Sequence, residues 1–312
     1  MESEPLVLTL DFGTQSVRAL IIDKLGNTLA CVKEPYEQAY FSIKTGYCEQ
    51  YPSYYWEKLC KVCKKLTKEQ KELMDRVKCI SMTCFRDTSV LLDENNEVIR
   101  PSILWLDQRL AEGKRKLPLL NRFLFKIVGM TDTVEMNMRR TAANWIQENE
   151  PENWAKTKHY VNISTYFVYR LVGELVDSIG NQTGHYPIDF KNKKWYGKHV
   201  LKQPIFGVDK EKCCRIVEAG DVLGKITKKC SEETGLKEGL VLIATGADKA
   251  CETIGTGCLT KDMASISYGT ASSIEVSNKK YIEPEQFLPA YPAAIPNLYN
   301  MEVQVYRGYW MI

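Results

Sequence analysis

The chain has 312 residues, of which 44% are hydrophobic and 26% charged, and 42 Lys+Arg against 39 Asp+Glu give a formal net charge of +3. At ~100–200 residues per domain this length predicts about two domains, and the composition is that of an ordinary globular protein. The two signs of charge are interspersed, which excludes the one-sided basic surface typical of nucleic-acid binding.

The N-terminus and the cysteines define the expected compartment. The longest apolar runs fall far below the ~18 residues that a membrane span needs, and the acidic start MESEPLVLTL is neither a signal nor a transit peptide. We therefore expect a cytoplasmic protein with reduced thiols. Cys60 and Cys63 form a CxxC, but WEKLCKVCKKL has the pattern of an amphipathic helix, so they are expected as buried small hydrophobes. A zinc site is not predicted, because the three histidines are scattered: His159, His185 and His199.

The first third of the chain predicts strands followed by a helix. Residues 5–34 contain three strands, LVLTLDF, VRALIID and TLACVKE, separated by turns at GTQS and KLGN. A helix is predicted from Pro52 to about Met74, with Ser53 as its N-cap. VKCISMT is a buried strand, and SVLLD-ENN-EVIRP is a hairpin with an Asn-rich turn.

The rest of the chain alternates between helices and strands. Residues 106–171 are predicted to be mostly helical, with interruptions at Pro118 and Pro151, and residues 177–195 are polar and rich in loops. GLVLIATGADKACETIGTG predicts a strand that breaks at glycine and leads into a helix. MASISYGTASSIEVS then predicts two strands joined by a Gly-Thr turn.

Two hairpins of the chain resemble each other. Phe12–Ser16 (FGTQS) aligns with Tyr268–Ser272 (YGTAS), each between two apolar strands. A tight turn that exposes backbone N–H groups and adds Thr and Ser hydroxyls is suited to bind a polyphosphate. The plain alternative is that both hairpins use common turn chemistry. A P-loop is excluded, since no GxxxxGK[ST] occurs.

Five segments resemble the FGGY family of carbohydrate kinases: DFGTQSVRALIID, GYCEQYPSYYWE, ILWLDQR, ATGADKACETIGTG and ISYGTASS. They occur in the family's order and approximate spacing across essentially the whole chain. The resemblance implies an α/β fold of the actin-like ATPase superfamily, in which ribonuclease-H-like lobes with a mixed β-sheet flanked by helices clamp ATP. It implies residues 1–257 as the N-terminal sugar-binding lobe and 258–312 as the beginning of the ATP-binding lobe. We expect that this stretch alone binds ATP poorly and turns over little.

The resemblance assigns the phosphate and metal residues. Asp11 matches an Asp near Mg²⁺ and the transferred phosphoryl group, which suits a hard oxygen ligand; the alternative is a turn-capping Asp. The ATP or phosphate contacts implied by the two hairpins are Thr14, Gln15, Ser16, Arg18, Gly269 and Thr270. Gln15 replaces the Thr or Ser of many relatives, and an ordinary hairpin turn is the alternative for Gly269 and Thr270.

Asp248 matches the general base of the family. An attacking hydroxyl must lose its proton, and a carboxylate between a strand and a helix can accept it. The alternative is an N-cap for the helix KACETIG. Many relatives carry Gln or Asn where this chain has Lys249. Asp248 is also expected to contact the substrate hydroxyl.

Substrate contacts are implied for three residues besides Asp248. Arg86-Asp87-Thr88 resembles the Arg-Glu-Thr of glycerol kinases, where Arg donates to and the acid accepts from vicinal hydroxyls. The alternative is a surface ion pair. Trp105 is the expected apolar wall for a sugar, whereas Asp107 and Arg109 are expected to be structural.

One departure concerns the edge of the pocket. Many relatives have Lys three residues before the Trp of AANWIQENEP, where this chain has Ala142. Arg139 and Arg140, just upstream, are candidates to replace it.

The expected function is ATP-dependent phosphorylation of a sugar hydroxyl, on a ketose such as a xylulose-like pentulose. Arg86 and Asp87 favour the alternative of a small polyol such as glycerol or erythritol. An actin-like nucleotide switch is the alternative from another class, and GYCEQYP and ILWLDQR count against it. The expected partner is a small sugar or polyol, the cofactors are ATP and Mg²⁺, and the oligomeric state stays open, with a homodimer among the options.

Overall fold

The protein is described from a computed structural model, which covers residues 4–268 and 272–305. Its central sheet has the strand order β13-β14-β5-β1-β2-β3. The strands are β1 (Leu6–Phe12), β2 (Ser16–Ile22), β3 (Thr28–Pro35), β5 (Val77–Cys84), β13 (Val222–Lys225) and β14 (Val241–Ile243). Neighbours β1, β2 and β3 are antiparallel, whereas β5 runs parallel to both β1 and β14. The sheet is therefore mixed, as predicted.

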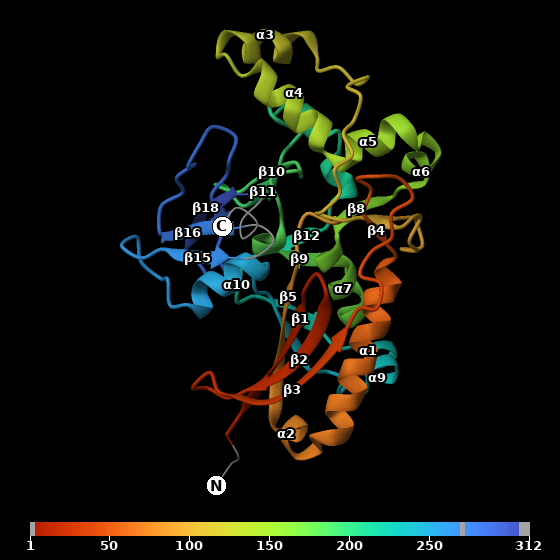
Figure 1. Cartoon of the computed structure of the whole chain (residues 1–312), viewed down its shortest axis with the longest axis vertical. Helices are drawn as coiled ribbons and strands as arrows, with labels where there is room; N and C mark the ends of the chain where they lie inside the picture. Colours follow the sequence, from red (N-terminus) through yellow and green to blue (C-terminus); the bar gives the residue numbers. More distant parts are fainter. Residues whose placement is uncertain (1–3, 269–271, 306–312) are drawn as a thin grey trace.

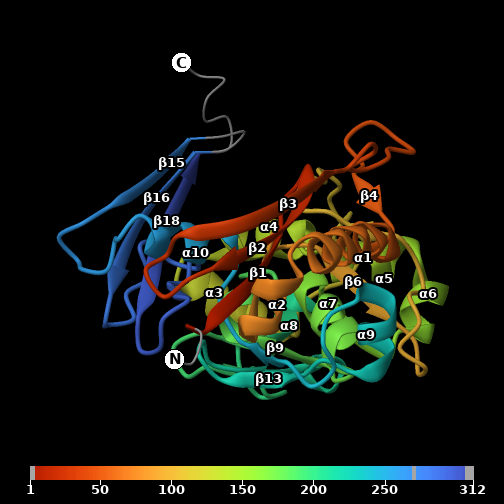
Figure 2. The same cartoon turned by 90° about the horizontal axis from the view of Figure 1, so that it is seen from below.

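Buried and more exposed residues alternate along the strands, and helices pack on the sheet (Figures 1 and 2). In β1, Leu6, Leu8, Leu10 and Phe12 are buried, and the residues between them are half-buried. The helices α1 (Pro52–Glu69), α7 (Ile163–Val172) and α9 (Lys228–Thr234) contact one another, and α1 and α7 also contact the sheet. The rings of Phe12 and Phe167 stack at 3.9 Å between centroids, which joins the sheet to α7.

The predicted helix at residue 52 is confirmed, but its details differ. Tyr51 is the N-cap instead of Ser53, because Pro52 occupies the first helical position, which suits its fixed φ. The helix also ends earlier than predicted, since Gln70 leaves the helical conformation and separates α1 from α2 (Lys71–Arg76). Cys63 is buried on α1, as expected, whereas Cys60 is only half-buried; both are free thiols in the structure.

A second layer lies above the central sheet in Figure 1. Its sheet has the order β4-β7-β6-β8. The elements are β4 (Glu49–Gln50), β6 (Ser89–Leu92), β7 (Ser102–Ile103), β8 (His159–Asn162), α3 (Leu119–Ile127), α4 (Thr131–Arg140), α5 (Ala142–Asn149) and α6 (Pro151–Lys156). The prediction of a mostly helical region 106–171 is correct for these four helices and wrong for β8, which pairs with the edge of β6. In the described part of the chain, no helix combines the length and apolar character needed to cross a membrane.

Short elements connect this layer back to the central sheet. They are β9 (Val176–Ser178), η1 (Ile179–Asn181), β10 (Ile188–Asp189), β11 (Lys194–Trp195), α8 (Gln203–Phe206), η2 (Lys210–Lys212), β12 (Arg215–Val217) and α10 (Asp248–Gly255). Asp177 on β9 is fully buried, and its carboxylate accepts hydrogen bonds from the side chains of Ser164, Thr165, Asn181 and Gln182. This carboxylate therefore fixes the turn that precedes residue 183.

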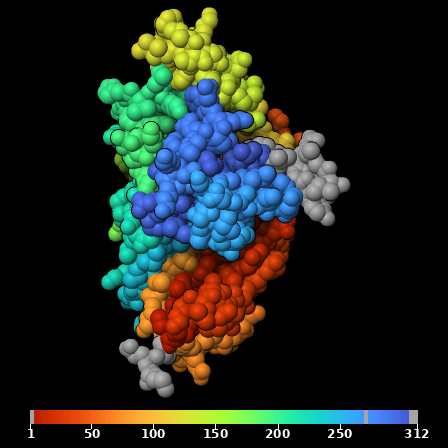
Figure 3. Space-filling view, turned by 90° about the vertical axis from the view of Figure 1, so that its left-hand side faces the viewer, coloured from red at the N-terminus to blue at the C-terminus, as the bar shows by residue number. Residues whose placement is uncertain are grey.

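Residues after α10 form a separate sheet, coloured blue in Figure 3. Its strands are β15 (Ser265–Tyr268), β16 (Ser272–Asn278), β17 (Tyr291–Pro292) and β18 (Tyr299–Val305), in the order β15-β16-β18-β17. The predicted strand pair is confirmed as β15 and β16. On β16, the polar Ser273, Glu275 and Ser277 are buried, whereas Ile274 is 50% exposed. The sheet thus turns its polar face toward the rest of the molecule.

Candidate active site

The predicted site residues gather because three parallel strands end at one edge of the sheet. Asp11 lies near the end of β1, Arg86 and Asp87 follow β5, and Asp248 follows β14. The carboxyl ends of parallel strands are the usual place for a ligand in open α/β sheets. The side chain of Thr83 on β5 also donates a hydrogen bond to the carbonyl of Gly246 at 3.1 Å. This bond connects the end of β5 to the loop that follows β14.

Asp11 is paired with Arg18 across the first hairpin. The two residues are direct partners in the β1–β2 register, and Arg18 Nη1 lies 3.3 Å from Asp11 Oδ2. Burial raises the pKa of Asp11, the charge of Arg18 opposes this rise, and the carboxylate of Glu252 adds to it. The partner of Asp11 in the structure is therefore Arg18, and the pair lies half-exposed at the strand end.

The turn of this hairpin is tight. The N–H of Gly13 donates to the carbonyl of Ser16 at 3.0 Å, and a Cβ at Gly13 would lie 3.3 Å from that same oxygen. Thr14 is half-buried, Gln15 is exposed, and Ser16 is buried as the first residue of β2. Phosphate contacts by these residues stay predictions. Gly269 and Thr270, the matching residues of the second hairpin, lie outside the described residues.

Asp248 is the first residue of α10, and the N-cap is Ala247. The alternative that Asp248 acts as the N-cap is therefore wrong. Its Oδ1 accepts from the N–H of Lys249 at 2.9 Å. Burial raises the pKa of Asp248, and the charge of Arg86 opposes the rise. The ammonium of Lys249 donates to Glu252 at 2.7 Å and to Ser267 at 3.0 Å, so its positive charge is paired with a carboxylate of the same helix.

Two glycines allow the loop before Asp248 to sit close to its neighbours. A Cβ at Gly246 would lie 2.8 Å from Ala250 Cβ and 3.1 Å from Ala294 Cβ. A Cβ at Gly180 would lie 3.2 Å from both Gly246 Cα and the carbonyl of Pro292. Contacts this close require glycine, because neither backbone nor Cβ atoms can swing away. Packing of η1 and of the last sheet therefore determines where Asp248 stands.

The structure separates Arg86 from Asp87. The guanidinium of Arg86 donates to Glu302 on β18 and lies over the ring of Tyr291, 4.7 Å from its centroid. Glu302 in turn faces Glu275 across the β16–β18 pair. Arg86 therefore connects the end of β5 to the last sheet. The alternative of a mutual surface ion pair between Arg86 and Asp87 is wrong. Substrate binding by Arg86 stays a prediction.

Asp87 is held by His185, which the sequence did not single out. His185 Nδ1 lies 2.9 and 2.8 Å from the two carboxylate oxygens, and Thr183 Oγ1 donates to Oδ1 at 3.2 Å. Burial alone would raise the pKa of Asp87, but His185 and Thr183 outweigh it and the pKa lies below its ordinary value. Asp87 also has a φ of 57°, which aspartate tolerates better than most residues. Its carboxylate is therefore ionised and fixed in direction.

Asp87 opens into a cavity of about 390 Å³, a volume typical of small-molecule sites (~300–1,000 Å³). Its lining includes Asp87, Ser89, Trp105, Asp107, Arg109, Met136, Arg140, Ala142, Tyr160, His185 and Tyr186. Trp105 is half-buried in this wall, where a sugar contact was expected. Of the two candidate arginines, Arg140 lines the cavity, whereas Arg139 Nε donates to the carbonyl of Ala111 at 3.2 Å. Arg86 and Asp248 are not part of this lining.

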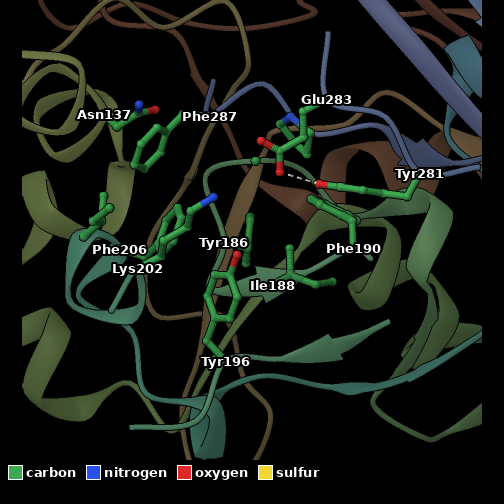
Figure 4. Close-up of a pocket in the computed structure, with 13 residues that line it drawn as sticks. Asn137, Tyr186, Ile188, Phe190, Tyr196, Lys202, Phe206, Tyr281, Glu283 and Phe287 are labelled. Atoms are coloured by element: carbon green, nitrogen blue, oxygen red, sulfur yellow. Dashed lines mark hydrogen bonds between the residues drawn. The ribbon is translucent and has the colours of Figure 1, made fainter. Parts of the chain in front are cut away.

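A neighbouring crevice is too small for a sugar. It measures about 40 Å³ and is lined mainly by aromatic and aliphatic side chains, among them Tyr186, Tyr196 and Phe287 (Figure 4). Tyr281 donates to Glu283 at 2.8 Å beside it. This volume has room for little more than water. The larger cavity at Asp87 is therefore the better candidate for the sugar.

Comparison with known proteins identifies the class. The profile of the "FGGY family of carbohydrate kinases, N-terminal domain" matches residues 6–255. Xylulose kinase of Lactococcus lactis is 26% identical over 304 residues, covering 97% of this chain and 59% of that protein. Glycerol kinase of Thermococcus gammatolerans is 25% identical over 284 residues, covering 89% and 55%.

The fold agrees with this assignment. The ligand-bound xylulose kinase from Lactobacillus acidophilus superposes with a TM-score of 0.79 at 18% identity, covering 97% of this chain and 60% of that one. The chain thus spans about three fifths of the length of the relatives it matches. It belongs to the FGGY family of carbohydrate kinases, and its central sheet with the flanking helices has the ribonuclease-H-like fold.

Proposed function

We propose that this protein transfers the γ-phosphoryl group of ATP to a hydroxyl of a sugar, with a ketose such as a pentulose as the substrate. The observation that carries the proposal is the gathering of Asp11, Asp87 and Asp248 at one sheet edge, next to a cavity of about 390 Å³ with a Trp wall. Membership of a carbohydrate kinase family supports it, and a xylulose kinase is among the relatives.

Asp248 acts as the general base in this proposal. Its carboxylate takes the proton of the sugar hydroxyl as the sugar oxygen bonds to the γ-phosphorus and the bond from that phosphorus to the β,γ-bridging oxygen breaks, which releases ADP. A raised pKa suits this role, because a base with a pKa closer to neutrality holds the proton better. Asp248 lies at the start of α10, and Asp87 holds the sugar through other hydroxyls.

The first hairpin is proposed to bind the phosphates. Gly13 brings the backbone of the turn together, Thr14, Gln15 and Ser16 supply donors, and Arg18 supplies positive charge. Asp11 fits a Mg²⁺ site, since this ion is often bound by one or two carboxylates plus substrate phosphates; the described residues hold no group of three or more His, Cys, Asp or Glu that could form a complete metal site. Bound Mg²⁺ would neutralise charge on the phosphates.

The last sheet is proposed as the beginning of the ATP-binding lobe. Its strands β15, β16 and β18 pair with one another and not with the central sheet. Its outer face carries Ile266, Ile274 and Val303, whose exposed fractions are 52%, 50% and 51%. Such a face is typical of a sheet that packs against further structure. Glu302 of this sheet pairs with Arg86 at the end of β5, and this contact supports the proposal that the sheet packs over the sugar-binding lobe.

A small polyol is the second candidate substrate. The resemblance of the sequence Arg86-Asp87-Thr88 to glycerol kinases favours it, and a glycerol kinase is among the relatives. The engagement of Arg86 by Glu302 counts against it, because the Arg is then occupied by another acid.

An ADP-release assay on the full-length protein, with ketoses, aldonates and polyols, tests the proposal. Turnover that depends on a ketose supports it, and dependence on a polyol supports the second candidate. ATP hydrolysis that ignores every sugar would contradict both and favour a nucleotide switch.

A further inference from the structure

Most charged groups in the cavity wall already have partners. Asp107 accepts from Arg109 at 2.7 and 2.8 Å and from the N–H of Cys48 at 2.7 Å. Arg109 also pairs with Glu49 at 2.8 Å, and its guanidinium lies 3.8 Å from the centroid of the Tyr47 ring. These two groups are therefore structural, as the sequence suggested, and are not available to a ligand.

Asp87 makes one end of the cavity an acceptor. Its carboxylate is oriented by His185 and Thr183, and an ionised carboxylate can only accept hydrogen bonds. A sugar hydroxyl can donate to it. A ketone or carboxylate oxygen of the ligand cannot, because it has no proton to give. Such an oxygen must therefore lie elsewhere in the cavity.

Arg140 supplies the opposite chemistry. It is the last residue of α4, its side chain is exposed, and it lines the cavity together with Met136 and Ala142. Within residues 4–268 and 272–305, its guanidinium has neither an ion pair nor a side-chain hydrogen bond. The carboxylate of Asp87 raises the pKa of His185, and the positive charge of Arg140 partly opposes this rise. The charge of Arg140 is therefore felt at the Asp87–His185 pair in the cavity wall. The small side chain of Ala142 leaves space beside it.

We propose that Arg140 binds an acceptor-only oxygen of the substrate, the ketone of a ketose or the carboxylate of a sugar acid, and so selects these substrates over polyols of equal length. A guanidinium can only donate hydrogen bonds, and a planar acceptor such as a carbonyl or carboxylate matches its fork. A polyol offers only hydroxyls, which Asp87 binds as well. The inference rests on the proposed sugar kinase function and specifies its substrate class.

Matched five-carbon ligands test the inference: D-xylulose, D-xylonate and xylitol. Affinities are measured by calorimetry and kcat/KM by ADP release, on the full-length protein and its Arg140→Gln variant. We expect Arg140→Gln to lower the affinity for D-xylulose or D-xylonate by about tenfold or more, and the affinity for xylitol by less than about threefold. Whichever of D-xylulose and D-xylonate the wild type binds more tightly shows whether the acceptor oxygen is a ketone or a carboxylate. Arg140→Lys keeps the charge and should restore part of the preference.

A control removes the same charge elsewhere. Arg122 is exposed on α3 and does not line this cavity, so Arg122→Gln should bind all three ligands like the wild type. An equal loss for all three ligands in Arg140→Gln, no loss, or the same loss in Arg122→Gln overturns the inference. If the wild type phosphorylates a sugar in these cases, only the inference fails. If the wild type acts on no sugar, the proposed function fails with it.

Discussion

Glu275 and Glu302 form a buried pair of carboxyl groups whose effect on stability is measurable. They face each other on β16 and β18 and are 3% and 6% exposed. Glu302 has Arg86 as its partner, whereas Glu275 accepts from Thr253 and, at 3.3 Å, from Asn300. Burial, and then the charge of Glu302, raise the pKa of Glu275 to about 7 from an ordinary value of 4.5. Glu275 therefore holds a proton in the folded state over a range where the unfolded chain has lost it.

The sign and size of the effect follow from this shift. Between about pH 4.5 and 7 the folded state binds more protons at Glu275 than the unfolded state, so the free energy of unfolding falls as the pH rises. A shift of about 2.5 units corresponds to about 3 kcal/mol at 1.36 kcal/mol per unit. This contribution is fully present below pH 4.5 and lost above pH 7. Glu275→Gln, which is uncharged at every pH, should remove this slope and be the more stable protein at pH 8.

Chemical denaturation at pH 5, 6, 7 and 8 measures this difference. Other groups titrate in the same range, so the relevant quantity is the difference between wild type and Glu275→Gln at each pH. Glu285→Gln removes the same charge from an exposed position and serves as the control. Parallel stability curves for the wild type and Glu275→Gln would refute the reasoning, because the burial of a charged Glu275 would then cost nothing.

Two further predictions concern the site. His185→Asn removes the imidazole that lowers the pKa of Asp87 against the effect of burial. Asp87 should then take up a proton more readily as the pH falls, so we expect sugar affinity to fall between pH 7 and 5 in the variant and to fall less in the wild type. Calorimetry at several pH values checks this, and equal pH profiles would contradict it. Gly246→Ala places a Cβ 2.8 Å from Ala250 Cβ, so we expect a loss of about 1–3 kcal/mol in unfolding free energy. Gly255→Ala, with open space around its Cβ, should not destabilise, and equal losses in both variants would refute the steric argument.

Local pattern predicted the elements that carry the catalytic candidates. The alternating apolar residues of β1 and the strand–glycine–helix pattern around Asp248 are visible in the sequence, because each depends on neighbours a few residues away. The parallel arrangement of β1, β5 and β14 then brings Asp11, Asp87 and Asp248 to one edge. The resemblance to a kinase family supplied the order of these motifs.

Long-range contacts were not predictable in the same way. His185 lies 98 residues from Asp87 in the chain, and Glu302 lies 216 residues from Arg86. Nothing in the residues around a single histidine or glutamate indicates such a partner. The strand β8 was missed for a related reason: its four residues become a strand only because the edge of β6 is available to pair with.

Sugar-dependent ADP formation by Asp248→Asn tests the proposed chemistry most directly. The variant keeps the size of the side chain and the acceptor oxygen for the N–H of Lys249, but it cannot take a proton. Sugar affinity and circular dichroism are measured in parallel to show that the protein is folded and binds its substrate. A fall in kcat of ~100-fold or more with affinity retained is the predicted result. Turnover near the wild-type rate would show that Asp248 is not the base.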